Sequence, residues 1–88
     1  MSKFAQKVKN YYDRGIWTES MVCDAYAKGR ITIAELTAIL GVEHKAEVME
    51  AIGSNPTKAA LLEVCEGLGI QADASMTKAE ILAMIEGV

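Results

Sequence analysis

The residues of this 88-residue chain that could carry acid–base or nucleophilic chemistry are few and far apart. The one histidine, His44, lies between the charged residues Glu43 and Lys45. A general base needs partners held beside it in a pocket, and none of the four serines has a histidine next to it in the sequence. The pattern predicts a surface histidine and a protein that is not an enzyme.

Metal and cofactor sites are not predicted either. A zinc site takes four ligands, commonly in closely spaced pairs, whereas Cys23, His44 and Cys65 are isolated from one another. A glycine loop that binds phosphate precedes a helix, but Gly67-Leu68-Gly69 follows a helical pattern. Two cysteines cannot make a disulfide framework. Because both have apolar neighbours, we expect two buried thiols.

Short helices are the elements expected to position these residues. Ser or Thr marks their starts and Gly their ends, and no segment alternates apolar and polar residues as a strand does. The expected fold is all-α, with about six short helices. Thr32 with Glu35, and Thr77 with Glu80, have the spacing of a capping box. The first four helices are expected at Ser2 to about Arg14, Glu19 to Lys28, Thr32 to Leu40 and His44 to Ile52. A fifth helix is expected to begin at Thr57, with its end frayed by Gly67 and Gly69, and a sixth to begin at Thr77.

The segment Gly53-Ser54-Asn55-Pro56 is the clearest break in the chain, because it combines a helix stop with a residue disfavoured in a helix before proline. We expect an N-terminal three-helix unit over residues 1–41, a helix and linker over 42–55, and a helix–extended loop–helix unit over 56–88. A chain this short forms either one compact domain or two small units that share a core. Hydrophobic residues make up 51% of it, so it is expected to fold.

Charge is distributed unevenly. Residues 1–42 contain six Lys or Arg against four Asp or Glu, whereas residues 43–88 contain three against eight. The acidic second half argues against tight phosphate binding, which needs several cations on one face. No apolar run reaches the roughly 18 residues of a membrane span, and the first ten residues lack the apolar core of a secretory signal. We therefore expect a soluble protein made in a cytoplasm, with no membrane partner.

Five aromatic residues lie in the first third of the chain. Their helical spacing favours burial in a core. The expected apolar face of the second helix, which includes Met21 and Ala25, should also be buried. The alternative is a protein-binding hot spot, where Trp and Tyr are enriched. Under that alternative the candidate protein-binding residues are Tyr12, Trp17 and Tyr26.

The stretch from Tyr11 to Gly41 resembles the XkdX-like family of short proteins, which are encoded in phages and defective prophages of Gram-positive bacteria. The matching pieces are Gly15-Ile16-Trp17-Thr18, Lys28-Gly29-Arg30-Ile31-Thr32 and Leu40-Gly41, and Leu36 departs from the aromatic residue expected there. Family members are encoded among tail and tail-fibre genes. The resemblance implies a structural or assembly role with other phage structural proteins as partners, in the host cytoplasm during assembly and in the virion tail.

The stretch from Pro56 to Glu86 resembles a SAP-like or HeH/LEM-like helix–extended loop–helix motif, through Thr57–Leu62, Leu68-Gly69-Ile70 and Met76–Leu82. The resemblance implies two helices packed through leucines, with Gly69 turning the chain into the loop. Many relatives bind DNA through basic residues, and Lys58 and Lys78 stand at comparable places. Nucleic-acid binding through these lysines is therefore an alternative function, disfavoured by the surrounding acids. Binding of another protein and formation of a homo-oligomer are further alternatives.

Overall fold

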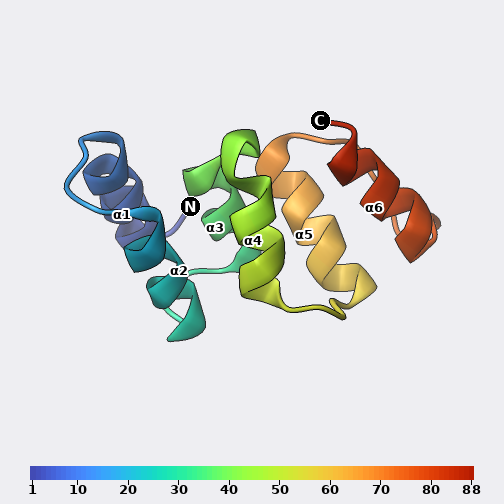
Figure 1. Ribbon diagram of the computed structural model, residues 1–88, viewed down its shortest axis with the longest axis horizontal. Coiled ribbons are helices and arrows are strands. Elements are labelled where there is room, and N and C mark those ends of the chain that lie inside the picture. Colours follow the sequence, from blue (N-terminus) through green and yellow to red (C-terminus); the bar gives the residue numbers. More distant parts are fainter.

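A computed structural model describes all 88 residues, and helices account for all of its regular structure (Figure 1). No strand is present, so the all-α prediction is confirmed. Along the chain the elements are α1 (Lys3–Asp13), α2 (Glu19–Ala27), α3 (Ile33–Leu40), the 3-10 helix η1 (Val42–His44), α4 (Lys45–Ile52), α5 (Lys58–Leu68) and α6 (Lys78–Glu86).

Five of the six α-helices begin after a Ser or Thr whose side-chain oxygen accepts a hydrogen bond from the backbone N–H three residues later. Both predicted capping boxes form. The N–H of Thr32 donates to Glu35 Oε1, and the N–H of Thr77 donates to Glu80 Oε1, each at 2.8 Å. The exception is α4, which continues directly from η1 and has no side-chain cap.

Two glycines end their helices in different ways. Gly69 follows α5 in the left-handed conformation, with φ 75° and ψ 21°. The next N–H, that of Ile70, donates back to the carbonyl of Cys65 at 2.8 Å, so the chain turns sharply into the loop. Gly53 follows α4 with φ 98° and ψ 170°, a region that is accessible essentially to glycine alone. The chain therefore leaves α4 in an extended direction toward α5.

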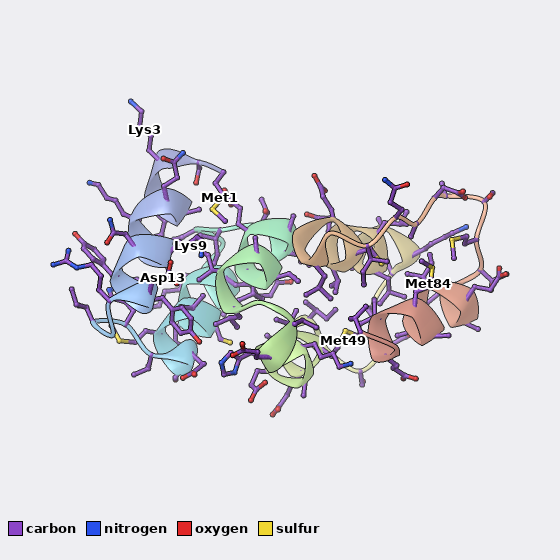
Figure 2. All side chains as sticks on the ribbon, turned by 90° about the horizontal axis from the view of Figure 1, so that it is seen from above. Met1, Lys3, Lys9, Asp13, Met49 and Met84 are labelled. Atoms are coloured by element: carbon purple, nitrogen blue, oxygen red, sulfur yellow. The ribbon has the colours of Figure 1, made fainter.

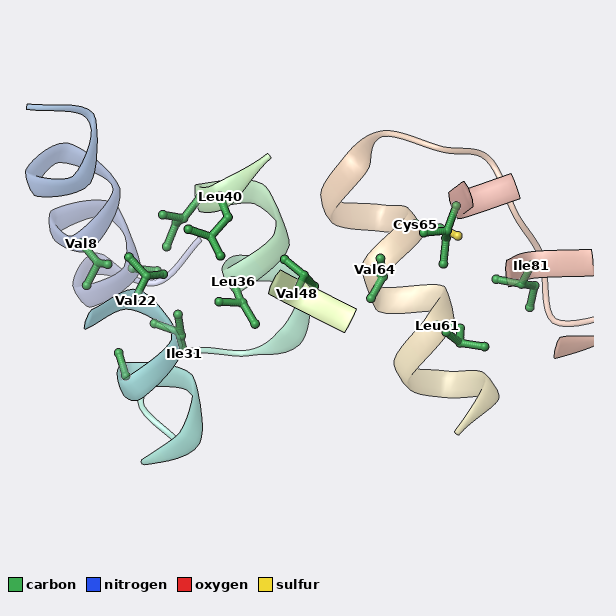
Figure 3. Close-up of a cluster of buried hydrophobic side chains, with 14 residues drawn as sticks. Val8, Val22, Ile31, Leu36, Leu40, Val48, Leu61, Val64, Cys65 and Ile81 are labelled. Carbon is green, nitrogen blue, oxygen red and sulfur yellow. The ribbon is translucent and has the colours of Figure 1, made fainter. Parts of the chain in front are cut away.

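One cluster of buried apolar side chains runs through all six α-helices (Figure 3). Val8 and Val22 lie at the α1–α2 end, Leu36 near the middle, and Leu61 and Ile81 at the α5–α6 end. The molecule is elongated, 37 × 22 × 21 Å, with α3 and α4 between the two ends (Figure 1). The core is thus continuous across the 53–56 linker.

The α3–α5 contact joins the two ends and is the most extensive between any two helices. Gly67 lies within α5, so the expectation that it frays the helix end is wrong. A Cβ at Gly67 would lie 2.6 Å from Thr37 Cβ and 2.7 Å from the carbonyl oxygen of Ala34. Glycine is required here because the α3 backbone approaches α5 so closely.

The α5–α6 pair has the predicted helix–extended loop–helix form, with residues 70–76 as the loop. Lys45, the first residue of α4, secures the far end of α6. Its Nζ donates to the carbonyls of Glu86 (3.0 Å), Ile85 (3.4 Å) and Val88. A cation at a helix C-terminus also interacts favourably with the helix dipole, so this lysine has a structural role.

Candidate protein-binding groove

A groove of about 220 Å³ lies between α1 and α2. Its lining comes from α1, from the α1–α2 connector, from α2 and from the connector to α3, which brings together residues separated by up to a third of the chain. Four lining residues are apolar and three are charged: Phe4, Trp17, Met21, Ala25, Asp24, Lys28 and Arg30. We refer to these seven residues as the Trp17 groove.

Trp17 is held in place by the end of α1. The Tyr11 carbonyl accepts hydrogen bonds from the N–H groups of Ile16 (2.8 Å) and Trp17 (3.2 Å). The rings of Tyr11 and Trp17 lie against each other with centroids 6.5 Å apart and an interplanar angle of 31°. This contact and the two hydrogen bonds position the indole ring at the groove wall.

Large apolar side chains remain exposed in and beside the groove. Met21 is 41% exposed, and Tyr11 and Ile16 nearby in the chain are 38% and 54% exposed. The expectation that Met21 belongs to the buried face of its helix is therefore only partly right, although Val22 and Ala25 are buried. An exposed methionine in a hollow that also contains a tryptophan and a phenylalanine is a feature of interaction surfaces.

Two cations border the apolar lining. The guanidinium carbon of Arg30 lies 5.9 Å from the centroid of the Phe4 ring, within the range of a cation–π interaction. Lys28 is the residue that follows α2. Neither side chain forms an ion pair or a hydrogen bond within the chain. Asp24 is the single carboxylate in the lining, so the groove carries an excess of positive charge.

The three aromatic residues named from the sequence do not form one surface. Trp17 lines the groove, while Tyr12 and Tyr26 are not part of its lining. Tyr26 is half-buried against the core. The Tyr12 hydroxyl donates to Glu19 Oε1 at 3.3 Å, and its ring meets that of His44 edge-on with centroids 6.3 Å apart. Burial, followed by the Glu19 carboxylate, raises the pKa of Tyr12.

His44 joins α2 to α4 and is only partly exposed. Its Nε2 lies 3.4 Å from Glu19 Oε1 and its Nδ1 lies 3.8 Å from Glu47 Oε2. Its position beside Tyr12 and two carboxylates gives it packing contacts between three elements. No group of three or more His, Cys, Asp or Glu side chains is placed to hold a metal ion.

The two cysteines differ in burial. Cys65 lies in the core, as expected, and burial raises the pKa of its thiol. Cys23 is only partly buried, so the expectation of two buried thiols is right for one of them. Burial, followed by the charge of Asp24, raises the pKa of Cys23 as well. Neither thiol is activated as a nucleophile.

The candidate nucleic-acid-binding lysines are both engaged within the chain. Lys58 Nζ donates to the carbonyl of Ala74 and so holds the 70–76 loop against α5. Lys78 Nζ lies 3.4 Å from Asn55 Oδ1. The remaining lysine of the acidic half, Lys45, is engaged with α6 as described above. Each of the three lysines of the back half thus has a hydrogen-bond acceptor within the chain.

The other two hollows of the surface are acidic. One lies between the start of the chain, α3 and α5, and its lining includes Glu35, Glu63 and Glu66 without a Lys or Arg. The other lies between α2 and α4, and its lining includes Glu19, Glu47 and Glu50, also without a cation. The Trp17 groove is thus the one hollow that combines aromatic, apolar and cationic side chains.

The protein is thus an all-helical fold with one groove that is lined by aromatic side chains and bordered by Lys28 and Arg30. No protein-family model matches the chain, and neither a curated protein nor a solved structure is found to be similar to it. None of the helices has the length and apolar character required to cross a membrane.

Sequence reasoning identified Trp17 but missed the rest of the groove. Met21, Asp24, Ala25 and Lys28 recur at the spacing of one helical face, which was a usable signal for a shared surface. Arg30 gave no such signal, because it lies beyond the end of α2 and reaches the groove only through the turn before α3.

Proposed function

We propose that this chain is a non-enzymatic structural or assembly protein of a phage or prophage, associated with the tail, that binds another phage protein through the Trp17 groove. The single observation that carries the binding role is the ordered Trp17 ring beside the exposed Met21 side chain in a groove. The phage context is supported by the resemblance of residues 11–41 to XkdX-like proteins.

The physical argument is one of burial. Trp and Tyr dominate the free energy of protein–protein binding when a partner removes them from water, and apolar surface gains about 25 cal/mol per Å² when it is buried. The Trp17 ring already packs against the Tyr11 ring, so it loses little conformational freedom on binding. Such a surface favours a protein partner over a small polar ligand.

The test is binding to the products of neighbouring tail and tail-fibre genes, measured by calorimetry, with the Met21→Ser and Val42→Ser variants in parallel. Met21 and Val42 have similar exposure, 41% and 45%, but only Met21 lines the groove. Met21→Ser is expected to weaken binding about tenfold, as at a hot spot, while Val42→Ser binds like the parent. Failure to bind any tail protein, with absence from purified particles by mass spectrometry, would contradict the proposal.

Nucleic-acid binding through the back half is a weaker proposal. It predicts salt-sensitive DNA binding that is lost on changing Lys58 and Lys78 to Glu. The internal hydrogen bonds of both lysines argue against it, and absence of a DNA shift at low salt would end it.

A further inference from the structure

We propose that the Trp17 groove recognises an acidic segment of its protein partner, in which one bulky aliphatic side chain is flanked by carboxylates. This inference rests on the proposed function and adds the chemistry of the partner. The aliphatic side chain would lie against Trp17 and Met21, and the carboxylates would meet Arg30 and Lys28.

The charge distribution supports an acidic partner at this place. Arg30 and Lys28 both line the groove and have no ionic partner within the chain. On α1, Lys3 extends into solvent, whereas Lys9 is paired with Asp13 at 3.1 Å (Figure 2). The other two hollows contain three glutamates each and no Lys or Arg side chain. Among the three hollows, an acidic segment is therefore attracted to the Trp17 groove and repelled by the glutamates of the other two.

The placement of Arg30 suits a carboxylate. Its guanidinium carbon lies 5.9 Å from the Phe4 centroid, near the outer limit of a cation–π contact, and its N–H groups have no hydrogen-bond partner within the chain, so they are available to a ligand. Arginine and carboxylate pair through two parallel hydrogen bonds, which fix direction as well as charge. Phe4 and Arg30 therefore place an apolar ring and a free guanidinium side by side in the same groove.

The size and apolar lining of the groove suit one large side chain. A volume of about 220 Å³ corresponds to roughly seven water molecules at ~30 Å³ each. An aliphatic side chain of the partner would displace that water from between Trp17 and Met21. Peptide segments commonly bind in this way, with one apolar side chain inserted into a groove.

A nucleic acid is a poorer fit to the same cations. Phosphate binding relies on several cations along one face, whereas the groove offers two and places the Asp24 carboxylate among them. The whole chain has a net charge of −3, so it repels a polyanion at long range.

The test uses the intrinsic fluorescence of Trp17, the single tryptophan of the chain. Three synthetic twelve-residue peptides without tryptophan are titrated into the full chain: a central Leu flanked by Glu, the same peptide with Lys for Glu, and the same with Ser for the central Leu. We expect a blue shift of the emission with the first peptide. Its affinity should exceed those of the other two at least tenfold and should fall as salt is raised from 0.05 to 1 M, through screening.

Variants separate charge recognition from simple apolar contact. Arg30→Gln and Lys28→Gln should each weaken binding of the Glu peptide about three- to tenfold, while Lys7→Gln, an exposed position on α1 outside the groove, should not. Equal binding of the Glu and Lys peptides, no response up to millimolar peptide, or displacement of the Glu peptide by a single-stranded oligonucleotide would each overturn the inference. A tail protein that loses affinity with Met21→Ser but not with Arg30→Gln would overturn it too, while leaving the proposed function intact.

Discussion

Gly67 of α5 and Thr37 of α3 meet at the closest approach of their two helices. A side chain at Gly67 would begin only 2.6 Å from Thr37 Cβ. Thr37 is fully buried, and its hydroxyl donates to the Ile33 carbonyl of its own helix at 2.8 Å, so no polar group is left unpaired in the contact. This crossing links the groove-bearing end of the molecule to the α5–α6 pair.

Gly67→Ala should destabilise the fold. Alanine favours a helix over glycine by about 1 kcal/mol, but here the added methyl overlaps both a side chain and the Ala34 carbonyl. Overpacking of this kind costs about 1–3 kcal/mol. After the gain in helix propensity is subtracted, we expect a net loss of about 1 kcal/mol and a drop in Tm of about 5 °C. Thermal unfolding followed by circular dichroism measures it. Glu66→Ala, an exposed neighbour in α5, is the control and should stay within about 0.5 kcal/mol; a Gly67→Ala protein of unchanged Tm would contradict the close crossing.

Asparagine should be tolerated at Gly69 and not at Gly53. Asn adopts the left-handed conformation of Gly69 more readily than other residues, whereas the conformation of Gly53 is essentially restricted to glycine and costs other residues about 1–3 kcal/mol. Urea unfolding of the two variants gives the comparison. Equal losses of stability would show that the two glycines are not distinguished by backbone conformation.

The stability of the fold should depend on the charge of Glu35 and therefore change at acidic pH. Hydrogen bonds from the N–H groups of Ser2 (2.7 Å) and Thr32 (2.8 Å) lower the pKa of Glu35 in the folded chain. A lowered pKa means that the carboxylate stabilises the fold fully above the unfolded value of about 4.3 and loses this effect as pH falls through the folded value. Glu35→Gln should therefore lower the Tm at pH 7 and have a smaller effect at pH 3. An equal drop in Tm at both pH values would show that the charge of Glu35 is not what stabilises the fold.

Lys58→Met should loosen the 70–76 loop while leaving α1 to α3 unaffected. The substitution keeps the alkyl chain but removes the donor to the Ala74 carbonyl, at an expected cost of about 1 kcal/mol. Amide hydrogen exchange resolved by residue should show faster exchange at Ile70 and Met76. The control is Lys78→Met, which removes only the longer contact to Asn55; equal exchange in the two variants would remove the structural role assigned to Lys58.

The cysteines should react with iodoacetamide in a fixed order under native conditions. Cys23 is partly exposed and Cys65 is 1% exposed, and both have raised pKa values, so both reactions are slow at pH 7. Mass spectrometry of peptides should find Cys23 modified first, with Cys65 modified only when the chain opens. Earlier modification of Cys65 would contradict its position in the core.

The sequence by itself determined the helices. Five of the six α-helix starts depend on a hydroxyl and an N–H three residues apart. Gly69 ends its helix through a bond to Cys65. This information lies within one or two turns of the chain. The helix starts, both capping boxes and the extended 70–76 loop followed from such short spacings. The tryptophan of the groove was likewise visible as an unusual residue in the connector between two helices.

Only the tertiary structure decided how the helices meet and which side chains remain free. Gly67 looked like a helix end, yet it lies within α5. A glycine is needed at this position because α3 leaves no room for a Cβ. The contact of Lys58 with the Ala74 carbonyl, sixteen residues away, also became apparent only in the fold. Phe4 and Arg30 became neighbours only through packing of α1 against the end of α2. Capping is a local interaction and can be read along the chain, whereas close packing and the pairing of charges depend on residues brought together from distant positions.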